Sequence, residues 1–129
     1  MRSKSPILPE RVRHISGSFS WLDHRLLHNG FLQLMQPEEM LLYFFLVLVS
    51  DKNGVSFYSY DSILRLLKLT LDQYITARDR LVELSLIAFD NGRYQVLELP
   101  KAPSHSELTR SGEIRSIKQV LEKISRASP

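Results

Sequence analysis

Four histidines are the residues whose chemistry would suit catalysis or metal binding, and only two of them are suitably spaced. His24 and His28 lie four residues apart, so on a helix they project from the same side. A tetrahedral metal site needs three or four protein ligands, and no third ligand follows from the spacing. The chain has no cysteine, which excludes thiol nucleophiles and cysteine-based zinc sites. We therefore expect neither a metal nor a cofactor.

Signatures of catalysis and of membrane insertion are also missing from the sequence. It contains no glycine-rich phosphate loop, no HExxH pair and no nucleophile-elbow serine. The longest apolar run, residues 40–49, is well short of the roughly 20 residues of a membrane helix, and the N-terminus lacks a signal-peptide run. We expect a non-enzymatic protein of the cytoplasm, with 43% apolar residues to build one packed core.

Positive charge is the second chemical feature, and its distribution matters more than its total of +3. Residues 1–16 hold four Lys/Arg against one acidic residue, and residues 100–129 hold six against three, so each end carries +3. Residues 17–99 hold seven against ten and carry −3. Attraction to nucleic acid is therefore expected from the two ends rather than from the middle.

A strongly apolar helix is the main element of the scaffold that must position these charged segments. Pro37 suits the first helical position, and Glu38 and Glu39 place negative charge at the positive end of the helix dipole. Residues 40–49 are apolar on every side of the predicted helix 37–50. We expect this helix to be central and covered on several sides.

A short amphipathic helix is predicted before it, over residues 21–28. Leu22, Leu26 and Leu27 share one face of this helix, and Asn29-Gly30 ends it, because these residues tolerate the left-handed conformation beyond a helix end. The sixteen residues before this region contain Pro6, Pro9 and no sustained period, which is typical of a mobile basic arm.

Two further helices follow a turn at residues 51–54 and a short β-rich stretch at residues 55–58. Ser59 is a suitable cap for a helix with the sequence YDSILRLLK, and Thr70 for a helix with the sequence LDQYITARDRLVEL. The second of these helices is expected to face inward through Tyr74, Ala77, Leu81 and Leu84. Two helices joined by about three residues form a helix-turn-helix unit.

A hairpin comes directly after this unit. Asn91-Gly92 separates two β-rich stretches, and this dipeptide favours a two-residue turn in which both residues have positive φ. The predicted domain therefore covers residues 17–99 in the order helix, short strand, helix, helix, hairpin. Residues 100–112 are proline- and serine-containing and are predicted to be a linker.

A C-terminal amphipathic helix is predicted over residues 113–126. Its apolar positions are spaced by three, four and three residues, and they are Ile114, Ile117, Leu121 and Ile124. An isolated helix of this length is only marginally stable, so this seam must dock on the chain's own core, on a second copy or on a partner's helix. We expect a homodimer that uses these four residues.

Residues 34–99 resemble the winged helix-turn-helix domains of plasmid, phage and transposon proteins, including replication initiators and regulators. The matching features are the leading Pro-Glu-Glu, the long apolar helix, the NGVSFYS turn and strand, and an Ala-Arg-x-x-Leu third helix that runs into Leu86-Ile87. The resemblance implies an α+β winged-helix fold, with a three-helix core, a short hairpin wing and extra terminal helices. It also implies double-stranded DNA as a partner.

The family resemblance implies that the third helix lies in the major groove while the wing touches phosphate or an adjacent groove. Its outward positions would be Leu71, Asp72, Gln73, Thr76, Asp79 and Arg80. Gln73 would read adenine, Thr76 a phosphate or a thymine methyl, and Arg80 a guanine or a phosphate. Further positive contacts would come from Arg65, Lys68, Arg93, Arg11 and Arg13.

Two acidic residues on the same helix favour a different kind of partner. Asp72 and Asp79 would face phosphate charge in a groove, and the short wing offers Arg93 alone. The alternative is a winged-helix protein-interaction module that does not bind DNA directly. A continuous positive surface over the third helix and wing would favour DNA, whereas an acidic or apolar surface would favour protein.

Overall fold

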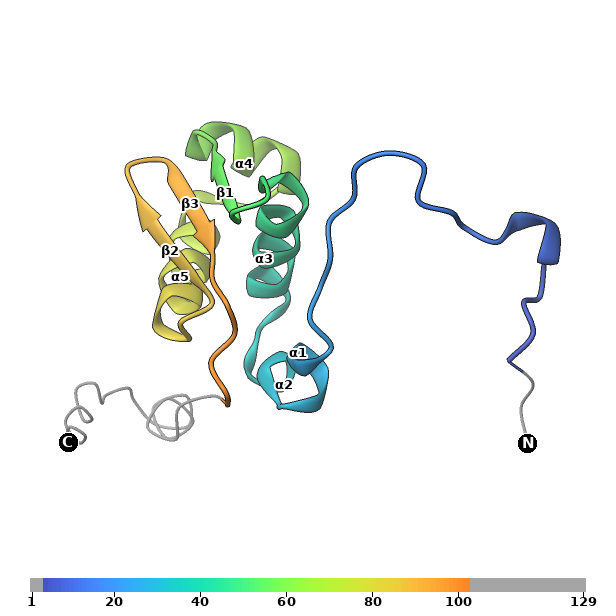
Figure 1. Ribbon diagram of the computed structural model, residues 1–129. Coiled ribbons are helices and arrows are strands. Elements are labelled where there is room, and N and C mark those ends of the chain that lie inside the picture. Colours follow the sequence, from blue (N-terminus) through green and yellow to red (C-terminus); the bar gives the residue numbers. More distant parts are fainter. Residues whose placement is uncertain (1–3, 103–129) are drawn as a thin grey trace.

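The computed structural model describes residues 4–102 (Figure 1). Its helices are the 3-10 turn η1 (Pro9–Arg11), α1 (Arg25–His28), α2 (Phe31–Leu34), α3 (Pro37–Val49), α4 (Tyr60–Leu67) and α5 (Leu71–Glu83). Its strands are β1 (Val55–Phe57), β2 (Ile87–Asp90) and β3 (Arg93–Val96). The predicted order of helix, short strand, helix, helix and hairpin is confirmed, and the C-terminal segment 113–126 lies outside the described residues.

The three strands form one antiparallel sheet in the order β1-β3-β2. The β2–β3 hairpin closes through Asn91 and Gly92, whose φ angles of +49° and +82° are those that the predicted two-residue turn requires. Asp90 and Arg93 face each other across this turn. The hairpin is therefore the wing, and it has the minimum loop length.

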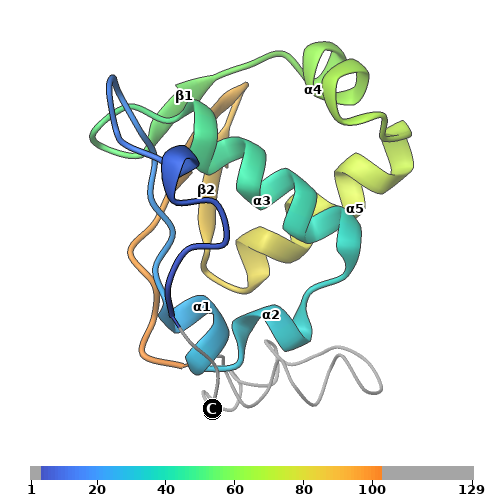
Figure 2. The same ribbon diagram turned by 90° about the vertical axis from the view of Figure 1, so that its right-hand side faces the viewer.

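The core lies where α3, α5 and the sheet meet, as Figures 1 and 2 show. Apolar side chains from several elements have no exposed surface, among them Phe31, Leu42, Leu46, Ile63, Leu81 and Leu86. The four inward positions predicted for the last helix, Tyr74, Ala77, Leu81 and Leu84, are all buried. Helical spacing alone thus identified the buried face of α5.

The short N-terminal helix differs from its prediction over residues 21–28. α1 begins only at Arg25, because Asp23 accepts the Arg25 backbone N–H at 2.9 Å and binds its guanidinium at 2.7 Å. Leu26 is buried, but Leu22 and Leu27 are exposed, so the predicted apolar face is wrong for two of its three residues. Gly30, with φ of +88°, ends the turn as expected and leads directly into α2.

The apolar helix α3 is not covered on every side within the described residues. Leu42, Tyr43, Leu46 and Val47 are buried, whereas Leu41, Phe44 and Leu48 remain 40%, 41% and 70% exposed. The helix is central and covered on several sides, as expected, but among the described residues the sheet, α5 and the N-terminal helices reach only part of its surface. We call Leu41, Phe44 and Leu48 the α3 stripe.

Candidate nucleic-acid interface

The turn between α4 and α5 is defined by side chains close to it in sequence. Ser59 accepts the Ser62 backbone N–H at 3.3 Å and caps α4. α4 ends at Leu67, and Lys68 after it adopts the left-handed conformation. Thr70 accepts the Gln73 backbone N–H at 3.1 Å, and the Gln73 side chain accepts the Thr70 N–H at 2.9 Å. This capping box fixes where α5 begins relative to α4.

Polar and aromatic contacts then fix the rotation of α5 about its own axis. The hydroxyls of Tyr74 on α5 and Tyr94 on β3 are hydrogen-bonded to each other inside the core. Burial, with this hydrogen bond as a further cause, raises the pKa of Tyr94 far above its ordinary value. The Arg78 guanidinium lies 4.6 Å from the Phe89 ring centre and 5.4 Å from that of Tyr74. The helix is therefore tied to both strands of the wing.

The outward face of α5 is acidic and apolar. Its exposed side chains are Leu71, Asp72, Gln73, Ile75, Thr76, Asp79, Val82 and Glu83. No lysine or arginine belongs to this set. Of the two arginines on the helix, Arg78 lies over the aromatic rings, and the Arg80 side chain is only 15% exposed and pairs with Glu83 at 3.4 Å. The positive surface that DNA would favour is therefore absent from the exposed residues of α5 itself.

The structure separates the predicted base-reading residues from one another. Thr76 is exposed at the middle of α5, as expected. Gln73 is exposed, but its side-chain oxygen is used in the capping box, which leaves its amide N–H groups for other contacts. Arg80 points toward Glu83. Burial raises the pKa of Glu39 on α3, and the nearby Arg80 charge offsets part of that rise.

Three predicted phosphate contacts surround α5. Arg65 and Lys68 are exposed at the C-terminal end of α4, and within residues 4–102 neither forms an ion pair. Arg93 is exposed on the wing, where it pairs with Asp90 at 3.1 Å. Arg11 and Arg13 are exposed in the N-terminal arm, which lies across α3 from α5 (Figure 1). The helix-turn-helix unit and the arm are thus separate sources of positive charge.

Arg78 is the residue near this surface whose role sequence reasoning missed. It follows Tyr74 by four residues, a spacing that places two side chains next to each other on a helix. That signal pointed to contact with Tyr74, but Phe89, eleven residues further on, joins it only through the fold of the hairpin.

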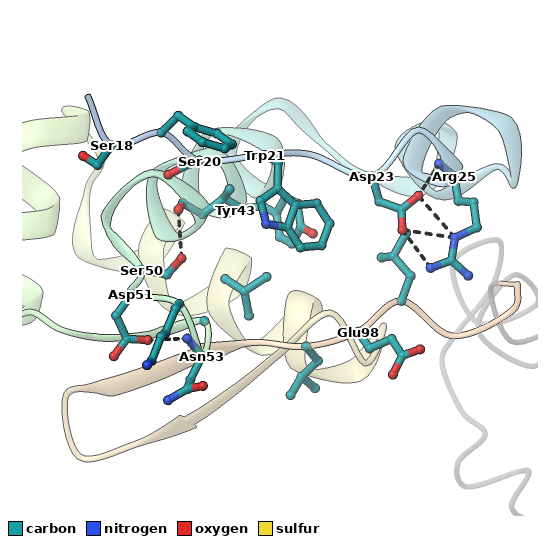
Figure 3. Close-up of a pocket in the computed structure, with 17 residues that line it drawn as sticks. Ser18, Ser20, Trp21, Asp23, Arg25, Tyr43, Ser50, Asp51, Asn53 and Glu98 are labelled. Carbon is teal, nitrogen blue, oxygen red and sulfur yellow. Dashed lines mark hydrogen bonds and ion pairs between the residues drawn. The ribbon is translucent and has the colours of Figure 1, made fainter. Parts of the chain in front are cut away.

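A pocket of about 810 Å³ lies on a different part of the domain (Figure 3). It is bounded by the extended segment 18–25, by α3, by the turn 51–54 and by residues 96–99. Arg25 lowers the pKa of Asp23 at its rim through their side-chain hydrogen bonds, and burial raises the pKa of Tyr43 in its wall. No residue of α5 or of the wing turn lines it, so it is not part of the candidate interface.

Metal and membrane chemistry gain no support from the described residues. The rings of His24 and His28 are neighbours, with centres 6.3 Å apart, but no group of three or more His, Asp or Glu residues within 4–102 is placed to hold a metal ion. In the same range no helix is long and apolar enough to span a membrane.

Comparison with known proteins agrees with this geometry. Residues 33–87 match a family model described as a helix-turn-helix domain. No curated protein and no solved structure matches the chain. The matched residues run from α2 through α5 to the start of β2, so they include the capped turn and the whole of the outward-facing helix. The chain therefore has an α+β winged-helix fold around a helix-turn-helix domain.

Proposed function

We propose that this chain is a non-enzymatic DNA-binding accessory or regulatory protein of a mobile element or replicon. The observation that carries the proposal is the helix-turn-helix domain itself, in which a capped and rotationally fixed α5 stands outward beside a hairpin wing. In this proposal α5 enters the major groove and the wing beside it touches the flanking backbone. The mobile-element setting rests on the resemblance of residues 34–99 to plasmid, phage and transposon domains.

Phosphate contacts supply most of the affinity in this proposal. Arg65 and Lys68 lie at the end of α4, before the turn that leads into α5, and Arg93 lies on the wing. Arg11 and Arg13 of the arm add contacts away from the helix-turn-helix unit. Because these contacts release counterions, affinity should fall steeply with salt. Sequence preference is weaker and rests on Thr76 and the Gln73 amide.

Binding to a mixed-sequence duplex, measured by fluorescence anisotropy at two salt concentrations, tests this proposal. Changing Arg65→Gln and Lys68→Gln together should weaken binding to all duplexes alike and remove about 0.9 from the salt slope for each phosphate that is no longer neutralised. Lys52→Gln is the matched control, because Lys52 lies in the turn before β1 and should leave the slope unchanged. Deleting residues 1–16 should also flatten the slope. No measurable binding by the intact chain at low salt contradicts the proposal.

A second candidate function is docking of a protein through α5. The observation that favours it is the outward face of α5, which combines Leu71, Ile75 and Val82 with Asp72 and Asp79 and lacks basic residues. A partner segment with apolar and basic side chains would complement this surface.

Asp72→Asn separates the two candidates. If α5 enters the groove, removing this negative charge should raise duplex affinity several-fold, because it no longer opposes the phosphates. Glu98→Gln removes a charge from the pocket region and serves as the control. Unchanged duplex affinity in Asp72→Asn, together with weak binding overall, favours the protein-docking function.

A further inference from the structure

We propose that the C-terminal seam formed by Ile114, Ile117, Leu121 and Ile124 packs on the α3 stripe of the same chain. This inference does not depend on the proposed function, because the stripe lies on α3 rather than on α5. It starts from the exposure of the stripe: Leu41, Phe44 and Leu48 are the part of an otherwise apolar helix that the described residues leave open. The other apolar surfaces of α3 are already taken by the core.

The stripe and the seam carry the same repeat. Leu41, Phe44 and Leu48 are separated by three and four residues, and the seam residues by three, four and three. Two helices whose apolar residues follow this spacing pack side by side with their side chains interdigitated. No charged residue interrupts the sequence from Leu41 to Leu48. The stripe therefore offers the uninterrupted apolar surface that the seam requires.

The position of the chain near residue 102 allows this contact. The Asn29 amide donates a hydrogen bond to the Lys101 carbonyl oxygen at 2.9 Å, which holds the end of the described chain beside α1 (Figure 2). Residues 103–112 number ten and reach at most about 33 Å when extended. α3, with 13 residues, is about 20 Å long. The linker is therefore longer than the helix that carries the stripe.

The extent of the stripe favours the chain's own segment over a second copy. Stable interfaces between separate proteins bury about 800 Å² on each partner, and three partly exposed side chains fall well short of that. A segment tethered by a short linker has an effective concentration of the order of millimolar, so a small surface is sufficient for it. The homodimer expected from the sequence is the competing outcome.

The outward face of α5 is a poorer site for the seam than the stripe. Its apolar residues Leu71, Ile75 and Val82 are separated by Asp72, Thr76 and Asp79. Packing isoleucines across this surface would remove the Asp72 carboxylate and the Asp79–Arg78 ion pair from water, which is costly. The same disulfide-trapping experiment can compare the stripe with the outward face of α5.

Disulfide trapping in the full chain tests the proposal, and the chain's lack of cysteine makes every introduced pair unambiguous. Phe44→Cys is combined in turn with Ile114→Cys, Ile117→Cys, Leu121→Cys or Ile124→Cys, and each pair is oxidised in dilute solution. At least one pair should form an intramolecular disulfide in most molecules, seen as a monomer of altered mobility. Ile75→Cys, combined with the same four changes, is the control on α5 and should cross-link at least tenfold less.

The other outcomes overturn the proposal. Covalent dimers as the main product of the Phe44→Cys pairs would assign the seam to a second copy. Preferential cross-linking to Ile75→Cys would assign it to α5, and cross-linking at neither position would leave the stripe without this occupant. As an independent measurement, Leu48→Glu should accelerate hydrogen exchange in residues 113–126 at least tenfold, whereas Val82→Glu should not. Equal exchange in both variants would also contradict the proposal.

Discussion

Helices α3 and α5 both span 13 residues and pack against each other, yet they are held by different forces. After its first turn α3 is held mainly by apolar burial, which is not directional, together with a hydrogen bond from the Ser20 hydroxyl to the Leu48 carbonyl oxygen at 3.2 Å. α5 adds directional contacts: the Thr70–Gln73 capping box, the Tyr74–Tyr94 hydroxyl pair and the stacking of Arg78. The difference shows that a helix with one functional outward face needs directional contacts that set its rotation. A helix in the core is held mainly by the burial of its apolar side chains.

The largest expected effect distinguishes the covered side of α3 from its stripe. Leu46 has no exposed surface and Leu48 is 70% exposed, although the same residue type stands on the same helix. Leu46→Ala should lower the free energy of unfolding by about 2–5 kcal/mol, because apolar burial is reduced and a cavity is left behind. Leu48→Ala should cost less, about 1 kcal/mol, because only the seam proposed above, and no part of the described core, covers this side chain. Urea unfolding of both variants checks this, and similar losses of stability would show that α3 is covered all round.

The next effect concerns the directional contacts of α5. Tyr74→Phe leaves the buried Tyr94 hydroxyl without its partner and should destabilise the protein by about 1–3 kcal/mol. Replacing both tyrosines with phenylalanine should cost less than the sum of the two single changes, because no hydroxyl then stays unpaired. A double-mutant cycle by chemical denaturation measures this coupling. Simple additivity would mean that the pair does not hold α5.

The helix cap of α5 gives a smaller effect with an internal control. Thr70→Ala removes the acceptor for the Gln73 N–H and should cost about 1 kcal/mol of stability. Thr76→Ala changes the same residue type at an exposed position in the middle of the helix and should be neutral or slightly stabilising. Thermal unfolding of both variants is the measurement. An equal loss of stability in the two variants would contradict the role of the cap.

The smallest effect is a pH dependence on α3. Burial raises the pKa of Glu39, which is 6% exposed and accepts the Gln36 backbone N–H at 3.1 Å. An acid whose pKa is raised by folding favours the folded state at low pH, and this contribution disappears as the pH rises from about 4 through the raised value. Glu39→Gln keeps the acceptor of the capping box without the charge.

The stability of Glu39→Gln relative to wild type should therefore increase between pH 4 and pH 7. Denaturant unfolding at both pH values measures the difference. Glu38→Gln, which alters the neighbouring acid outside the capping box, should show a smaller change. A relative stability that instead declines as the pH rises would mean that burial does not dominate at Glu39.

Local signals predicted much of the fold from the sequence. Pro37 at the first turn of α3, the caps Ser59 and Thr70, and the Asn91-Gly92 turn all lie where they were expected. Each depends on a few neighbouring residues, so the sequence alone contains the information. The short helix α1 was less predictable, because Asp23 delays its start through a side-chain contact that no periodicity records.

The sequence by itself determined the elements, their order and the buried face of α5, because capping, turn geometry and helical periodicity are local. Only the tertiary structure decided which side of α3 stays open, since a helix that is apolar all round has no preferred face until its neighbours are in place. The structure also decided the roles of the charges near α5. Arg78 is drawn onto Phe89 and Arg80 toward Glu83, so the outward surface is left acidic and apolar. The Arg78–Phe89 contact joins residues that meet only when the hairpin folds back on α5, whereas the Arg80–Glu83 pair forms within the helix itself.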